Sequence, residues 1–101
     1  MKITAIEVVN AVCEHYNLEF KDVVGISRTE KLVDARSVAV YLIDALCTDT
    51  YREDIANLFS RDMDSIYHTI RKVRKIINTT VQHKILNALC DVYVELQDTT
   101  E

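Results

Sequence analysis

The sequence predicts an all-α protein that forms one domain over residues 1–101, and three observations support this. Hydrophobic residues recur at helical spacing along most of the chain. One glycine and no proline are far fewer than turn-rich β folds need. Hydrophobic residues make up 49% of the chain, and a domain of this size buries roughly 65% of its unfolded surface. We therefore expect a compact helical domain with one core.

The first helix should begin at a capping box, in which the side chains of Thr4 and Glu7 bond to exposed backbone N–H groups. An apolar stripe at helical spacing follows, and Asn17 is expected to end the helix. A short helix over residues 20–24 should stop at Gly25, the one residue free to adopt a left-handed C-cap. A loop is expected after this glycine.

Two more helices are predicted from capping boxes of the same kind. The box of residues 27–30 opens a long helix over residues 30–47. The box of residues 50–53 opens a short helix that ends near Phe59. The stripe expected on the buried side of the long helix consists of Leu32, Ala35, Ala39, Leu42 and Leu46.

Residues 55–77 have the pattern of two helices that are separated by a polar turn. Asp62 is expected to cap the second of them, which covers residues 63–77. That helix presents polar residues at its start and cations at its end. This arrangement is typical of a helix-turn-helix, whose second helix enters the major groove of DNA. The chain is therefore predicted to be a small duplex DNA-binding module.

A last helix is expected to start at Thr79 or Thr80 and to run to Gln97. Its apolar residues follow the spacing of a coiled-coil seam. This seam either folds back over the domain core or forms a homodimer contact, which would place two recognition helices on two DNA half-sites. The seam consists of Ile85, Leu89, Val92 and Leu96.

The distribution of charge bears on the kind of partner. The formal net charge is −4, whereas DNA-binding domains are usually basic. Residues 61–75 hold five cations against two aspartates and carry +3, and residues 76–101 hold one lysine against four carboxylates and carry −3. We therefore expect a basic face for DNA beside an acidic tail. The net acidity keeps an alternative open, a protein-interaction module that kept the fold and lost DNA binding.

The sequence lacks the residues that several other classes of function require. No window is apolar enough to span a membrane and no signal peptide is recognisable, so a cytoplasmic, nucleoid-associated protein is expected. With one glycine the chain cannot form a phosphate-binding loop, and we expect no enzyme activity and no cofactor. The cysteines have no Cys-x-x-Cys spacing, which favours buried reduced thiols over a zinc site with histidines. The residues concerned are Cys13, Cys47, Cys90, His15, His68 and His83.

Two segments carry a resemblance to a known family. They are Ala35-Arg36-Ser37-Val38-Ala39-Val40-Tyr41-Leu42 and Arg61-Asp62-Met63-Asp64-Ser65-Ile66-Tyr67-His68. In order and spacing, residues 6–76 resemble the C-terminal DNA-binding domain of the bacterial replication initiator DnaA. The resemblance implies a helix-turn-helix fold of the DnaA C-terminal or Trp-repressor type, to which residues 79–97 add a C-terminal helix. It also implies a duplex DNA-binding protein that regulates replication initiation or transcription.

The resemblance places nine residues at the DNA, and two of them, Met63 and Asp64, depart from the family pattern. It implies that Arg28 enters the minor groove, whose negative potential favours arginine. Asp62 either accepts a hydrogen bond from cytosine or serves only as the helix N-cap. Further contacts would be made by Arg61, Ser65, Arg71 and Lys72, while His68 would either contact the DNA backbone or serve as a packing residue. The alternative for each cation is an ordinary charge in solvent.

The chain departs from the family pattern at its recognition segment. Met63 replaces a base-reading histidine and Asp64 replaces a serine or threonine, while a Gly-Gly turn is reduced to Ser60. The loss of one good base contact removes about 1–3 kcal/mol of discrimination. Binding to the family's usual DNA box is therefore expected to be weakened or altered.

Overall fold

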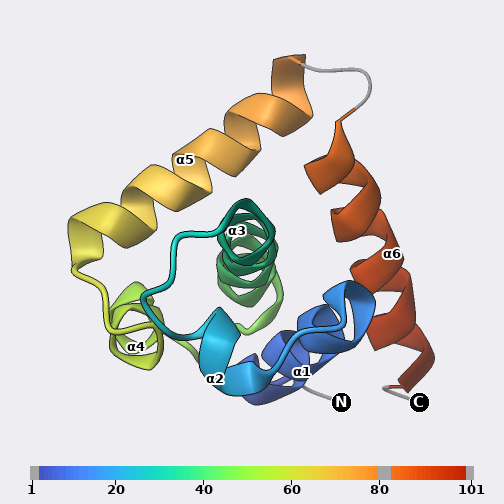
Figure 1. Ribbon diagram of the computed structural model, residues 1–101, viewed down its shortest axis with the longest axis horizontal. Coiled ribbons are helices and arrows are strands. Elements are labelled where there is room, and N and C mark those ends of the chain that lie inside the picture. The colour runs from blue at the N-terminus through green and yellow to red at the C-terminus, as the bar shows by residue number, and fades with distance from the viewer. Residues whose placement is uncertain (1–2, 80–82, 100–101) are drawn as a thin grey trace.

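The computed structural model of this chain describes residues 3–79 and 83–99, and this part contains helices and no strand. The helices are α1 (Ala5–Tyr16), α2 (Phe20–Val23), α3 (Glu30–Leu46), α4 (Arg52–Leu58), α5 (Met63–Thr79) and α6 (Lys84–Thr99). Figure 1 shows α3 in the middle of the molecule, with the other helices arranged around it. The prediction of an all-α domain is confirmed.

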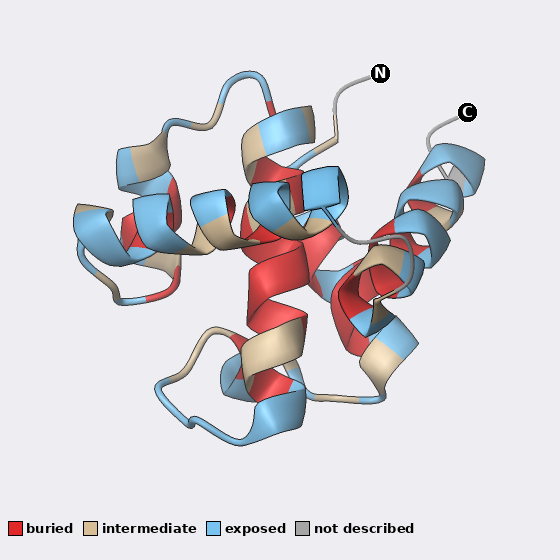
Figure 2. Ribbon diagram, turned by 90° about the horizontal axis from the view of Figure 1, so that it is seen from above, coloured by how far each residue is buried: buried red, intermediate tan, exposed pale blue. Residues whose placement is uncertain are grey.

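The central helix α3 is buried on almost every side, because it contacts each of the other helices. Residues 35–40 are buried without interruption, as the red stretch in Figure 2 shows. The single buried stripe that we predicted for this helix is too narrow, since Val38, Val40 and Ile43 are also buried. Leu46, which belonged to that stripe, is only half-buried. A helix that is covered all round needs apolar residues all round.

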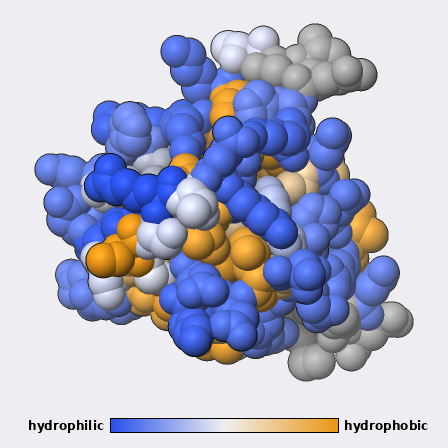
Figure 3. Space-filling model, in the orientation of Figure 1, coloured by the Kyte–Doolittle hydropathy of each residue, from blue (hydrophilic) through white to orange (hydrophobic). Residues whose placement is uncertain are grey.

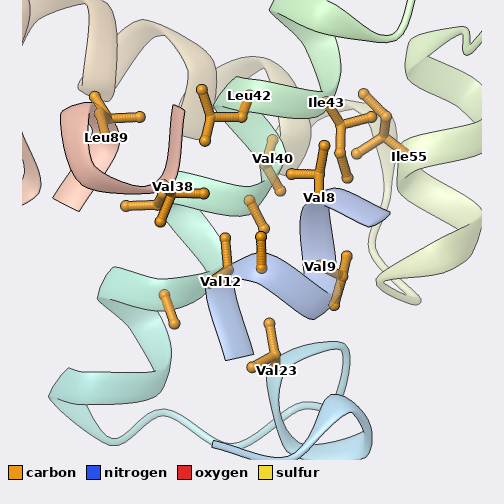
Figure 4. Packing of buried hydrophobic residues seen from close by; sticks show 14 of the residues in the cluster. Val8, Val9, Val12, Val23, Val38, Val40, Leu42, Ile43, Ile55 and Leu89 are labelled. Carbon is orange, nitrogen blue, oxygen red and sulfur yellow. The ribbon is translucent and has the colours of Figure 1, made fainter. Parts of the chain in front are cut away.

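Valine side chains dominate the centre of the core (Figure 4). Val8, Val9 and Val12 of α1 meet α3, and Leu89 reaches the same cluster from α6. The whole predicted seam of α6 is buried, with no residue more than 7% exposed, so it folds back over the chain's own core. The residues of this seam are Ile85, Leu89, Val92 and Leu96.

The start of α6 differs from the prediction. The helix begins at Lys84, because the helix before it continues to Thr79; Thr80 lies outside the described residues. The Nδ1 atom of His83 accepts a hydrogen bond from the N–H of Ile85 at 3.1 Å and satisfies one exposed donor of the new helix. Lys84 then ties α6 to α3 through ion pairs with Glu30 and Asp34, at 3.1 and 2.9 Å.

The ends of α1 follow the prediction. The N–H of Glu7 donates to Thr4 Oγ1 at 3.2 Å, and the N–H of Thr4 donates to Glu7 Oε1 at 3.3 Å, which together form the capping box. Asn17 ends the helix in the left-handed conformation, with φ of 57°. Both features are local in sequence, and both predictions are confirmed.

The ends of the next helices correct three predictions. Gly25 has no positive φ; a Cβ atom there would lie 2.9 Å from the carbonyl oxygen of Lys21, so close packing explains the glycine. The N-cap of α3 is Thr29, whose side chain makes no capping bond, so the box of residues 27–30 does not form. At α4 the cap shifts by one residue, because Asp54 Oδ2 accepts the N–H of Tyr51 at 2.9 Å.

One of the three cysteines lies outside the core. Cys13 and Cys47 are buried and free, as expected, and burial raises the pKa of both thiols. Cys90 is also free but exposed, so its predicted burial is wrong. It lies on the outer side of α6, between the buried positions Leu89 and Val92.

Replacing Ile43 by alanine should lower the free energy of unfolding by about 2–5 kcal/mol, because the side chain is fully buried in the central helix. Denaturation followed by circular dichroism measures this change. Ile6→Ala is the matched control, since Ile6 is 49% exposed and its loss should change stability by less than about 0.5 kcal/mol. Equal losses for the two variants would contradict the packing described above.

Candidate nucleic-acid interface

A hollow of about 470 Å³ lies where α3, the loop before it and the first half of α5 meet. We call it the α3–α5 hollow. Seven of the nine predicted DNA-binding residues line it, although they come from separate segments of the chain. These seven are Arg28, Arg61, Asp62, Asp64, Ser65, His68 and Lys72. Hydrophilic residues cover most of the face shown in Figure 3, including the outer side of α5.

The other two predicted residues lie elsewhere. Met63 is half-buried and packs against the hydrophobic core, which explains an apolar residue at the start of a polar helix face. Arg71 is exposed on α5 and is not part of the hollow's lining. It forms no hydrogen bond or ion pair with a residue that the structure describes.

The turn before α5 is built by Ser60 and Asp62. Ser60 adopts the left-handed conformation with φ of 53°, which lets the chain reverse direction without glycine. Asp62 Oδ1 accepts the N–H of Ser65 at 2.8 Å and caps the helix as predicted. Hydrogen bonds from the backbone and then the side chain of Ser65 hold the pKa of Asp62 below its ordinary value. The carboxylate is therefore ionised at neutral pH.

Arg36 lines the hollow as well, although no role was predicted for it. It is only 7% exposed, and its guanidinium donates to the carbonyl oxygens of Val23 at 2.8 Å and Asp22 at 3.3 Å. Burial, and then the charge of Arg61, lower the pKa of Arg36 from its ordinary value. The signal that could have revealed it is the pair of polar residues Arg36 and Ser37 between Ala35 and the apolar residues 38–43 of α3.

Arg61 also holds the loop that follows α2. Its Nη2 atom donates to the carbonyl oxygen of Gly25 at 3.4 Å. Together with Arg36, it anchors the loop segment that leads to Arg28. Arg28 itself is exposed and has no partner among the described residues. Its guanidinium is therefore free to meet an anion at the rim of the hollow.

The floor of the hollow contains a chain of two hydrogen bonds between α5 and α3. Lys72 Nζ donates to Ser37 Oγ at 3.0 Å, and the Ser37 hydroxyl donates to the carbonyl oxygen of Val33 at 2.9 Å. Lys72 makes no ion pair with a carboxylate in the described part of the chain. Its positive charge therefore remains available in the hollow. Ser37, like Arg36, was missed by the sequence prediction.

The side chain of Arg52 connects α4 with both α3 and α5. Arg52 of α4 forms an ion pair with Asp44 of α3 at 3.0 Å. The same guanidinium lies 4.7 Å from the ring centroid of Tyr67 on α5, a distance at which cation–π attraction operates. The two helices of the predicted helix-turn-helix are thus fastened to each other and to the central helix.

The helices that form this hollow match a known family. The family described as bacterial DnaA protein helix-turn-helix matches residues 6–73. The chain belongs to this family. The predicted resemblance, which covered residues 6–76, is confirmed for this DnaA-family domain over residues 6–73. Only α6 lies wholly beyond the matched range.

Three relatives named chromosomal replication initiator protein DnaA illustrate the similarity. The protein of Cereibacter sphaeroides is 32% identical over 80% of the chain and 18% of its own length. That of Tropheryma whipplei is 33% identical over 75% of the chain and 16% of its own length. That of Campylobacter jejuni is 30% identical over 81% and 19%. The chain thus spans less than a fifth of each relative's length.

Two other kinds of feature are absent from the described residues. None of the helices is both long enough and apolar enough to cross a membrane. No cluster of three or more histidine, cysteine, aspartate or glutamate residues suited to a metal ion occurs among residues 3–79 and 83–99.

The lowered pKa of Asp62 predicts how stability changes in acid. The capping bond to Ser65 stabilises the fold fully above the pKa of an unfolded aspartate, about 3.9, and this contribution is lost as pH falls through the lower folded value. Asp62→Asn keeps a capping oxygen but cannot titrate. Urea unfolding from pH 7 to pH 2 should therefore show less acid destabilisation in Asp62→Asn than in the unmodified chain.

The matched control for this series is Asp64→Asn. Asp64 lies in the same first turn, and its carboxylate forms no hydrogen bond within the described residues. If the two asparagine variants lost the same part of the acid response, the capping bond could not be its origin.

Proposed function

We propose that this chain is a duplex DNA-binding module that uses α5 as a recognition helix, and that it regulates replication initiation or transcription. One observation carries the proposal: cations from three separate segments meet in the α3–α5 hollow, and none of them has a carboxylate partner among residues 3–79 and 83–99. They are Arg28, Arg61 and Lys72. Membership of the DnaA helix-turn-helix family supports the same conclusion. We further propose that this DNA-binding protein is cytoplasmic and nucleoid-associated, and that it has no enzyme activity.

Each group in the hollow has a role that suits its chemistry. Lys72 and Arg61 neutralise phosphates, which supplies most of the salt-sensitive affinity. The Ser65 hydroxyl donates to a phosphate oxygen, and His68 contacts the backbone one turn further along α5. Arg28, on the anchored loop, enters the minor groove. Arg71 lies outside the hollow and reaches a phosphate on its flank.

The start of α5 sets the sequence preference in this proposal. Met63 is engaged with the core, so it offers at most an apolar contact to a thymine methyl group. One carboxylate oxygen of Asp62 accepts the capping hydrogen bond from the N–H of Ser65, and the other can accept a hydrogen bond from the amino group of a base. Asp64 brings a negative charge close to the phosphates. Together these residues favour weaker and altered recognition compared with the family's DNA box.

Removing two cations of the hollow should weaken duplex binding. For Arg61→Ala combined with Lys72→Ala, the negative slope of log affinity against log salt should become shallower by about 2, because each phosphate contact contributes about −0.9. Fluorescence anisotropy with a labelled duplex, measured across a salt series, gives this slope. Lys21→Ala is the control, because Lys21 lies on α2 outside the hollow and is highly exposed.

Both replaced cations also form internal hydrogen bonds, so the melting temperature of the double variant must be measured alongside. Arg28→Ala offers a second variant that removes a cation without an internal partner. Unchanged affinity and salt slope in both of these folded variants would show that the contacts are wrongly assigned.

Restoring the family pattern at the start of α5 should improve recognition of the DnaA box. Met63→His combined with Asp64→Thr supplies a base-reading side chain and removes a negative charge. The preference for the box over a scrambled duplex should rise by about 1–3 kcal/mol. Asp64→Thr alone is the comparison, since it should raise affinity for both duplexes without preference. An equal gain for the two duplexes in the double variant would exclude base reading at position 63.

The net charge of −4 favours one alternative of a different class, a protein-interaction module that no longer binds DNA. The absence of any duplex retardation at low salt, together with a stable protein complex, would favour it. A homodimer through α6 would have to use its outer side, where Tyr93 and Val94 are 44% and 57% exposed. Light scattering with and without duplex tests this dimer.

A further inference from the structure

Ser37 occupies an unusual place for a polar side chain. It is 2% exposed and lies in the uninterrupted buried stretch of α3, yet it also lines the α3–α5 hollow. Its hydroxyl proton is used in the bond to the carbonyl oxygen of Val33 at 2.9 Å. The oxygen therefore faces Lys72 as an acceptor only, at 3.0 Å from Nζ. Such a group cannot donate to a phosphate itself and can act on a ligand only through Lys72.

Lys72 has the complementary property. An ammonium group carries three donors, and one of them is used by Ser37. No carboxylate of the described chain competes for the other two. A free lysine loses considerable side-chain freedom when it binds a ligand. In this molecule part of that freedom is already lost before any ligand binds, because Lys72 is half-buried and its ammonium group is hydrogen-bonded to Ser37.

We infer that Ser37 is a positioning residue for DNA binding, which holds the Lys72 ammonium in the hollow ready to contact a backbone phosphate. This inference rests on the proposed function and deepens it. The hydrogen bond between Ser37 and Lys72 already orders the lysine side chain in the free protein. Less conformational entropy is therefore lost when DNA binds, and the affinity is higher. The partner is recognised through its phosphate oxygens, and Ser37 contributes no sequence preference.

The test is a double-mutant cycle on duplex affinity. Ser37→Ala should weaken binding about fivefold, a typical effect of losing one intramolecular hydrogen bond, and should do so equally for box and scrambled duplexes. In the Ser37→Ala background, Lys72→Ala should cause a much smaller further loss than it causes alone. The control cycle pairs Ser37→Ala with Lys75→Ala, which removes an exposed cation of the same helix that has no contact with Ser37. Those two effects should multiply.

Two further measurements separate positioning from a general effect on folding. Ser37→Thr retains a hydroxyl that can bond to the carbonyl four residues earlier, and it should restore most of the affinity. In the free protein, NMR order parameters of the Lys72 ammonium group should fall in Ser37→Ala and recover in Ser37→Thr. A change in stability alone would not alter Lys72 selectively over Lys75.

The outcomes distinguish this inference from the proposed function. If the unmodified chain binds duplex DNA but the effects of Ser37→Ala and Lys72→Ala multiply, Ser37 does not act through Lys72 and the inference is overturned. Affinity unchanged in Ser37→Ala overturns it too. If the unmodified chain binds no duplex at low salt, the proposed function fails, and the positioning role for DNA fails with it. Strong coupling with Thr rescue supports the inference.

Discussion

The burial of two polar residues in the central helix determines how the other segments are arranged. Arg36 and Ser37 lie in the middle of α3 at 7% and 2% exposure, and a buried polar group is costly unless it is hydrogen-bonded. Arg36 finds its partners in the carbonyl groups of α2, and Ser37 finds one in Lys72 of α5. Within the described residues, no buried side-chain nitrogen or oxygen lacks a partner. The two sides of the hollow are thus tied to one turn of α3.

The charges of this domain are arranged so that an acidic chain can present a basic surface. The carboxylates near α3 and α4 are partly paired, as between Arg52 and Asp44 or between Lys84 and Asp34. The cations at the hollow keep their charges free, and local fields of one sign can steer an oppositely charged partner even when the net charge opposes it. The net charge of −4 therefore describes the average surface and not the part that would meet DNA.

How much of this structure could be predicted depends on how far apart the interacting residues lie along the chain. The capping box of Thr4 and the cap at Asp62 join residues three apart, and both could be recognised from the sequence. The family resemblance identified Arg28, Arg61 and Lys72 as candidates, and all three line the α3–α5 hollow. Their contacts with DNA are part of the proposed function. Arg36 and Ser37 could not be recognised, because their partners lie 13 and 35 residues away. The capping box predicted at α4 failed because Asp54, next to Glu53, accepts the N–H of Tyr51 instead. The box predicted at α3 failed because the N-cap Thr29 makes no side-chain bond.

The helix that lies beyond the family match has a consequence for where the folding unit ends. Its buried side chains Ile85, Ala88, Leu89, Val92 and Leu96 complete the core against α1 and α3. The residues that match the family end at 73, so a fragment cut there would lose all five and expose the valines of α1 to water. The range of the family match is therefore shorter than the stretch of chain that cooperative folding requires. A boundary drawn from the family match alone would divide a single hydrophobic core.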